Sequence, residues 1–120
     1  MKLHNLYLVD YENVHQHGLN GIGELTEQDH LVIFWGAKCG SLKGDTYKQI
    51  ISSKAKLDFK TSTTVASQYI DTWIDSYLGY LLGTNSYDEV FIISNDKGFQ
   101  SMIDLWSNHK ISRRKSIAYA

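Results

Sequence analysis

Three aspartates stand at positions where folding could bring their carboxylates together. Asp10 follows the apolar run Leu6–Val9, and Asp96 comes shortly after the apolar run Val90–Ile93. Asp71 lies on the apolar stripe of a long predicted helix, where an unpaired carboxylate would be costly. Carboxylate oxygens are hard ligands that favour Mg²⁺ or Mn²⁺. The chemistry that these three residues would support is therefore that of a divalent cation.

The charge around these aspartates supports the same interpretation. Between Thr61 and Asp96 the sequence holds five acids and no lysine or arginine that could neutralise them. Mutual repulsion would then raise a carboxyl pKa or recruit a cation. Taken singly, Asp10 and Asp96 are equally well explained as loop acids or helix N-caps. The distinguishing signal is the expected convergence of all three.

The elements that must position these residues follow from the apolar rhythm of the chain. Continuous apolar runs at 6–9, 31–35 and 90–93 are typical of buried parallel strands. The run at 57–61 alternates, which is typical of an edge strand, and 111–119 is a weaker candidate for a last strand. Helical spacing predicts helices at about 45–54, 66–82 and 98–108. This alternation predicts an α/β fold, a three-layer α/β/α sandwich with a mostly parallel central sheet. Because ligands bind outside the carboxyl ends of such strands, the three aspartates are expected at one corner.

Composition narrows the class of protein. The chain has 120 residues and a formal net charge of −1, which predicts a single domain over residues 1–120. The apolar runs are too short for a membrane span, which needs about 20 residues. The chain opens without a charged and apolar leader, so a cytoplasmic protein is expected. The lone Cys39 excludes an internal disulfide and a thiolate zinc site.

The basic residues are segregated from the acidic centre. Residues 38–60 carry six lysines and two aspartates, and four further basic residues follow Leu105 without any acid. A basic flank beside an acidic centre would fit a polyanion held against a cation site. Two solvated faces of different charge explain the pattern equally well.

Other motifs give weaker evidence about function. The glycine- and lysine-rich segment 36–46 lacks the ending of a phosphate-binding loop, and His15 and His17 have no matching third ligand. The three tryptophans are interpreted as core residues rather than base-stacking platforms. Tyr11 is the exception, because it directly follows Asp10 at the expected rim of the sheet.

Three blocks together resemble the bacterial PIN-like nucleases of the NYN type. They are LYLVDYENVHQHGLNGI (6–22), SQYIDTWIDSYLGYLLG (67–83) and VFIISNDKGFQSMI (90–103). The first resembles the opening strand of the family, the second the helix with its inward aspartate, and the third the strand that ends in Ser-x-Asp-Lys-Gly. The blocks stand in the order of the family and extend over nearly the whole chain.

This resemblance implies a metal-dependent endoribonuclease that hydrolyses phosphodiester bonds of single-stranded RNA. Asp10, Asp71 and Asp96 would be the ligands of Mg²⁺ or Mn²⁺, and Asn13 and Ser94 would support them by hydrogen bonds. The ion would activate a water for in-line attack. Residues expected to contact the RNA are Tyr11, Lys43, Lys97, Arg113 and Arg114.

One departure from the family pattern leaves a second interpretation open. Gln100 stands where the family often places a further acid, which weakens a second metal position unless Asp45, Asp75 or Asp104 compensates. The alternative function is a catalytically weak PIN-like adaptor that binds RNA or a protein. A homodimer is also open, because small domains of this kind can pair to widen the binding surface.

A third interpretation is a phosphohydrolase of the haloacid-dehalogenase kind, since Asp10 also follows the first strand. That chemistry requires an aspartate two residues later, where Glu12 stands, and this interpretation is therefore disfavoured.

Overall fold

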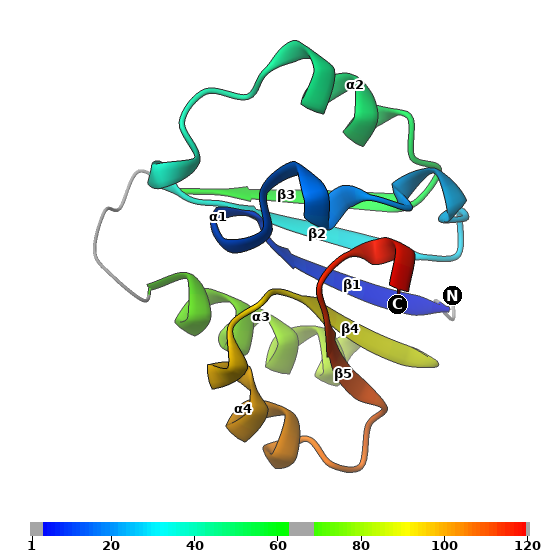
Figure 1. Cartoon of the computed structure of the whole chain (residues 1–120). Coiled ribbons are helices and arrows are strands. Elements are labelled where there is room, and N and C mark those ends of the chain that lie inside the picture. The colour runs from blue at the N-terminus through cyan, green and yellow to red at the C-terminus, as the bar shows by residue number, and fades with distance from the viewer. Residues whose placement is uncertain (1–3, 63–68, 120) are drawn as a thin grey trace.

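Five parallel strands form one sheet at the centre of the computed structural model, which describes residues 4–62 and 69–119 (Figure 1). The strands are β1 (Asn5–Asp10), β2 (His30–Trp35), β3 (Lys56–Thr61), β4 (Glu89–Ile93) and β5 (Ile111–Arg114). Their order is β3-β2-β1-β4-β5, and every neighbouring pair is parallel. The predicted α/β fold with a parallel sheet is confirmed, and β3 lies at an edge as its alternating sequence indicates.

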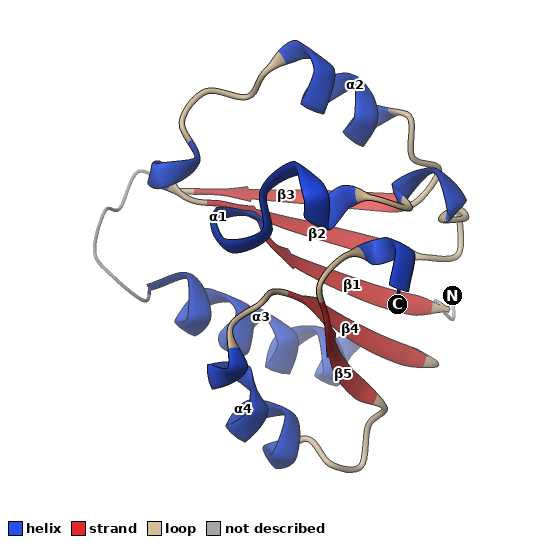
Figure 2. Ribbon diagram, viewed as in Figure 1, coloured by secondary structure: helices blue, strands red, loops and turns tan. Residues whose placement is uncertain are grey.

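Helices cover both faces of this sheet, as Figure 2 shows. They are α1 (Tyr11–Val14), α2 (Gly44–Ile51), α3 (Tyr69–Thr84) and α4 (Gln100–Leu105). The α1 and α2 side encloses one apolar core, and the α3 and α4 side encloses the other. The expected three-layer sandwich is therefore confirmed. No helix of residues 4–62 and 69–119 has the length and apolarity needed to cross a membrane.

Strand β1 supplies both cores at once. Tyr7 and Val9 belong to the core under α1 and α2, whereas Leu6 and Leu8 belong to the core over α3 and α4. A central parallel strand is buried on both faces, which explains why its sequence is a continuous apolar run. The following residue, Asp10, is the first ionisable group after this run and still belongs to the strand.

The helix boundaries differ from the expected ones where local geometry competes with periodicity. The helix expected at 98–108 is a 3₁₀ turn (Lys97–Phe99) followed by α4, and the chain leaves helical geometry at Trp106. The strand expected within 111–119 ends at Arg114, and Ile117–Tyr119 is a 3₁₀ turn. The single turn α1 has no expected counterpart, because four residues are too few to show a helical period. Part of the expected start of α3 falls on 66–68, outside the described residues.

The strand order places a topological switch point between β1 and β4. From β1 the chain adds β2 and then β3 on one side, and it then crosses through α3 to form β4 on the other side of β1. A crevice opens outside the carboxyl ends of the two strands at such a point. Asp10 closes β1, and Ser94 to Asp96 follow β4, so both segments border this crevice.

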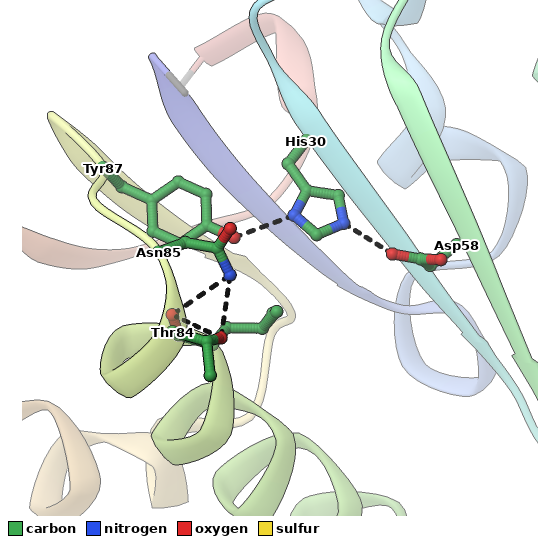
Figure 3. A network of polar contacts seen from close by, with 6 residues as sticks. His30, Asp58, Thr84, Asn85 and Tyr87 are labelled. Carbon is green, nitrogen blue, oxygen red and sulfur yellow. Dashed lines mark hydrogen bonds and ion pairs between the residues drawn. The ribbon is translucent and has the colours of Figure 1, made fainter. Parts of the chain in front are cut away.

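A buried histidine joins three segments at the opposite end of the sheet, where β2 begins (Figure 3). The His30 ring is 1 % exposed, and its Nδ1 and Nε2 lie 2.8 Å from the Tyr87 hydroxyl and 2.6 Å from Asp58 Oδ2. Burial raises the pKa of Tyr87 to about 12, so this phenol keeps its proton. With a ring proton on Nε2, His30 donates to Asp58, and its Nδ1 can accept from the Tyr87 hydroxyl. The network ties the edge strand β3 to the segment after α3.

Removing this network should destabilise the domain in a graded way. Tyr87→Phe loses one hydrogen bond and should lower the free energy of unfolding by about 1 kcal/mol. His30→Ala leaves two partners unpaired and opens a buried space, so about 3 kcal/mol is expected. Urea unfolding followed by circular dichroism measures both. The control Tyr80→Phe, on an exposed side chain, should stay within about 0.5 kcal/mol of wild type. A His30→Ala variant as stable as wild type would contradict this role.

Candidate functional site

A polar pocket of about 310 Å³ lies at the carboxyl edge of the sheet, at the switch point. The end of β1, helix α1, the turn after β2, the first residues of α3 and the turn after β4 all contribute to it. Its lining residues are Asp10, Glu12, Asn13, Lys38, Tyr69, Ile70, Asp71 and Asp96. The structure therefore brings the three predicted aspartates into one pocket, although they come from distant segments.

Asp10 is held by a short relay of hydrogen bonds that starts in the turn after β4. Its carboxylate is only 4 % exposed and accepts a hydrogen bond from the Ser94 hydroxyl at Oδ2 (3.0 Å). The Ser94 oxygen in turn accepts from the Asp96 backbone N–H (3.1 Å). This relay links two of the three aspartates through one fully buried serine.

Two further hydrogen bonds fix the turn that carries Asp96. The Asn13 side-chain oxygen accepts from the Asn95 backbone N–H (2.6 Å), which joins α1 to the turn after β4. On the other side of the turn, the Arg113 guanidinium donates to the Ser94 carbonyl (3.0 Å). The supporting positions of Asn13 and Ser94, predicted from the resemblance, therefore have contacts that could orient the aspartates.

Asp71 and Asp96 meet across the pocket. Asp71 lies in the first turn of α3, and Asp96 caps the 3₁₀ turn before α4 by accepting from the Gly98 N–H (2.8 Å). The Asp96 carboxylate is close enough to Asp71 to disfavour its ionisation. Burial and the charges of Asp96, Asp10 and Asp75 raise the pKa of Asp71 to about 6.

The pocket holds more negative charge than its surroundings favour. Burial is the largest cause that raises the pKa of Asp10 to about 6, and the charges of Glu12 and Asp96 add to it. The hydrogen bond from Ser94 acts in the opposite direction, because it stabilises the carboxylate. Both Asp10 and Asp71 therefore pay an electrostatic cost when they ionise without a counter-charge.

Glu12 is a fourth carboxylate in the pocket, at a position for which the sequence predicts no role there. Its Oε2 accepts from the Tyr69 hydroxyl (3.3 Å), and the Tyr69 oxygen accepts from the Ala37 N–H (3.1 Å). A Cβ atom at Gly36 would collide with both the Glu12 carboxylate and the Tyr69 hydroxyl, so a glycine is required for this approach. The position of Glu12, two residues after Asp10 at the end of β1, was the available signal.

Lys38 also lines the pocket and was grouped only with the basic segment in the sequence analysis. It lies in the 3₁₀ turn Ala37–Cys39 that follows β2. Nothing in its spacing distinguishes it from the other lysines of residues 38–60, because its place depends on how this turn folds over the sheet edge.

The donor chemistry of the pocket fits a hard divalent cation. Carboxylate oxygens are the ligands that Mg²⁺ and Mn²⁺ prefer, and a cation would offset the repulsion that Asp96 and Asp10 exert on Asp71. Among residues 4–62 and 69–119, no three His, Cys, Asp or Glu side chains are placed so that together they could hold one metal ion. The ligand roles of Asp10, Asp71 and Asp96 therefore stay a prediction.

The residues expected to contact RNA lie outside this pocket. Tyr11 is buried and stacks on Trp35, with ring centroids 4.3 Å apart. Lys43 is exposed and lines a different hollow, beside α2. Lys97 is exposed next to Asp96.

The two arginines of β5 make different contacts. Arg113 is partly buried and donates to the turn after β4, as described above. Arg114 is exposed, and its guanidinium lies 5.5 Å from the centroid of the Phe91 ring. Neither arginine lines the pocket, but Arg113 contacts the turn after β4 that carries Ser94 and Asp96.

Three acids could compensate for the one that the family often has at the position of Gln100. They are Asp45, Asp75 and Asp104, and none of them lines the pocket. Gln100 donates to Asp104 (2.9 Å) along α4, and Asp45 lies in the first turn of α2. Asp75 stands one turn after Asp71 and contributes to the raised pKa of Asp71. The fourth carboxylate of the pocket is instead Glu12.

Comparison with known protein families shows to which family the chain belongs. The family model described as PIN domain matches residues 4–116. The chain belongs to the PIN-domain family. No curated protein and no solved structure matches the chain significantly. PIN domains are generally nucleases and usually depend on metal ions, which agrees with a carboxylate-lined pocket at the sheet edge.

The cost of ionising Asp10 should be measurable in this PIN domain without divalent ions. Because the pKa is raised from 3.8 to about 6 in the folded protein, wild type should lose stability as pH rises through this range. Asp10→Asn removes the charge and keeps an acceptor for Ser94. Its advantage in urea unfolding with EDTA should grow between pH 4.5 and 7.5 to on the order of 2 kcal/mol. Asp45→Asn, on the exposed start of α2, is the matched control. An Asp10→Asn variant without any advantage at pH 7.5 would contradict the assignment.

Proposed function

We propose that this PIN domain is a metal-dependent endoribonuclease that hydrolyses phosphodiester bonds of single-stranded RNA. The observation that carries the proposal is the convergence of Asp10, Asp71 and Asp96 on one pocket at the switch point. Membership of a family whose members are generally nucleases supports the class of reaction. The choice of RNA rests on the resemblance of the three sequence blocks to the NYN type.

The side chains of the pocket have distinct roles in this proposal. Asp10, Asp71 and Asp96 would hold Mg²⁺ or Mn²⁺, which when bound supplies charge neutralisation and lowers the pKa of water. Ser94 would keep Asp10 oriented through its hydroxyl, and Asn13 would keep the turn after β4 in place.

Two residues that the sequence analysis did not assign would act on the substrate side of the pocket. Lys38 is the basic side chain among the described residues that line the same pocket, and it could face a phosphate there. Glu12, oriented by the Tyr69 hydroxyl, could accept a hydrogen bond or a proton from a water at the pocket.

We further propose that the chain is of the NYN type and that residues 1–120 form one nuclease domain. The order of the three blocks supports the type, and one continuous sheet over residues 5–114 supports the single domain. A single cysteine fits the reducing cytoplasm, where we expect the protein to act. The homodimer stays a prediction.

Cleavage of labelled single-stranded RNA and DNA tests the proposed function. Wild type should cut RNA with Mn²⁺ or Mg²⁺ and should not cut with EDTA. Asp10→Asn and Asp71→Asn should each lose at least about a hundredfold in rate, whereas Ser94→Ala should lose about tenfold to a hundredfold. The acid-to-amide control Asp45→Asn, remote from the pocket, should cut like wild type.

Three results of this assay would contradict the proposal. Cutting that survives Asp10→Asn and Asp71→Asn would place the chemistry elsewhere. Preference for DNA would overturn the substrate. Binding of RNA that persists with EDTA, without cleavage under any condition, would favour the adaptor function instead.

A further inference from the structure

An apolar groove of about 330 Å³ runs between the edge strand β3 and helix α3, outside the carboxylate pocket. Its lining residues place it on the face of the sheet that α3 and α4 cover, beside the edge strand β3. Its lining residues are Phe34, Lys60, Trp73, Ser76, Tyr77 and Tyr80. Four of these six are aromatic, and none of the described residues that line the groove is acidic.

The aromatic rings form a row along one side of α3. Trp73, Tyr77 and Tyr80 are spaced by four and three residues, which places them on the same helix face. The rings of Tyr77 and Tyr80 are stacked, with centroids 5.8 Å apart and planes inclined by 23°. Tyr80 is 61 % exposed, so one end of this row presents a large ring to solvent.

A lysine from β3 completes the groove. Lys60 Nζ lies 4.6 Å from the centroid of the Tyr77 ring, a cation–π contact between two residues that line the groove. Lys56 and Asp58 lie four and two residues before Lys60 in the same strand, so all three project from one face, and the Asp58 carboxylate is hydrogen-bonded to His30. The groove therefore combines aromatic faces with positive charge on its β3 side.

The row of rings is continuous with the carboxylate pocket. Tyr69 lines that pocket, and its ring makes an edge contact with the Trp73 ring, with centroids 5.5 Å apart. From Tyr69 to Tyr80 the helix axis rises by roughly 16 Å. A chain that leaves the carboxylates along α3 would meet these rings in succession.

We propose that this groove binds single-stranded RNA, with bases stacked on Trp73, Tyr77 and Tyr80 and a phosphate paired with Lys60. The inference rests on the proposed function and adds the path that the RNA takes from the carboxylates. Aromatic platforms beside basic side chains are how proteins hold single strands without reading sequence. The ammonium that lies over Tyr77 can move to a phosphate while the ring takes a base.

Charge favours RNA over a second copy of the chain as the occupant. In a two-fold symmetric dimer the same patch would lie on both subunits. Lys56 and Lys60 of one copy would then approach the same lysines of the other, and lysines on an edge strand oppose such pairing. A polyanion instead gains from both lysines, because the acid between them, Asp58, is hydrogen-bonded to His30.

Hydrogen bonds connect the two walls of the groove. Asp58, two residues before Lys60, is hydrogen-bonded to His30, which also contacts Tyr87 after α3 (Figure 3). The buried network thus links the β3 wall to the far end of the α3 wall. A preformed groove loses less conformational entropy when a flexible strand binds.

Fluorescence anisotropy with a labelled oligouridylate of about twelve nucleotides tests the groove. Because the groove lies outside the carboxylate pocket, binding is measured with EDTA, where no cutting occurs. Tyr80→Ala should weaken binding about fivefold to a hundredfold through lost stacking. Lys60→Gln should weaken binding and lower the slope of log affinity against log salt by about 0.7. Tyr47→Ala and Lys48→Gln, matched changes on exposed side chains of α2, should bind like wild type.

Tryptophan fluorescence gives a second reading. The oligouridylate should quench the emission of wild type, and Trp73→Phe should lose most of this quenching while it keeps an aromatic platform. Tyr80→Ala and Lys60→Gln variants that bind like wild type would overturn the inference, as would a wild type that does not bind at all. A dimer that becomes monomeric in Tyr80→Ala, with unchanged oligonucleotide binding, would assign the groove to a second copy and also overturn it.

The outcomes separate this inference from the proposed function. Weakened binding in Tyr80→Ala and Lys60→Gln, with no cleavage by wild type, would support the groove and contradict the nuclease. Cleavage by wild type that is unaffected in both variants, with unchanged binding, would support the nuclease and contradict the groove.

Discussion

The burial of Asp10 at the end of the central strand is the constraint on which the rest of this site depends. A carboxylate that is almost fully enclosed needs hydrogen bonds, a proton or a counter-cation to be tolerated. Ser94 supplies a hydrogen bond, whereas Glu12 and Asp96 add charge of the same sign. The parallel sheet concentrates this unfavourable charge at its carboxyl edge, because β1 and β4 end side by side there.

Most of the polar contacts around the edge serve to hold this arrangement. Asn13 and Arg113 each form a hydrogen bond to the backbone of the turn after β4, and these bonds hold the segment that carries Ser94 and Asp96. Gly36 leaves room for the Glu12 carboxylate under the Tyr69 hydroxyl. Clustered like charges of this kind lower the stability of the fold when the carboxylates ionise without a counter-charge. At the opposite end of the sheet, the buried His30 pairs both ring nitrogens, with Tyr87 and with Asp58, so its polar groups are satisfied.

The sequence predicts the fold well because strands buried on both faces have continuous apolar sequences, such as that of β2. It also predicts that Asp71 joins Asp10 and Asp96, since the register of α3 places that residue at the sheet edge. Glu12 and Lys38 escape such prediction, because their places depend on a glycine and a 3₁₀ turn in another segment. Trp73 was expected in the core. It packs against the core and also lines the groove, because no described element covers the crease between β3 and α3.

Direct binding of Mn²⁺ tests the central claim, that folding assembles a cation site from Asp10, Asp71 and Asp96. The electron paramagnetic resonance signal of free Mn²⁺ can be titrated with wild type, Asp71→Asn, Asp96→Asn and the remote control Asp104→Asn. We expect wild type and Asp104→Asn to remove the free signal with at least one tight site, and the other two variants to weaken binding by tenfold or more, as about 10–100-fold losses are typical even for supporting residues. Equal binding by all four proteins would contradict the account.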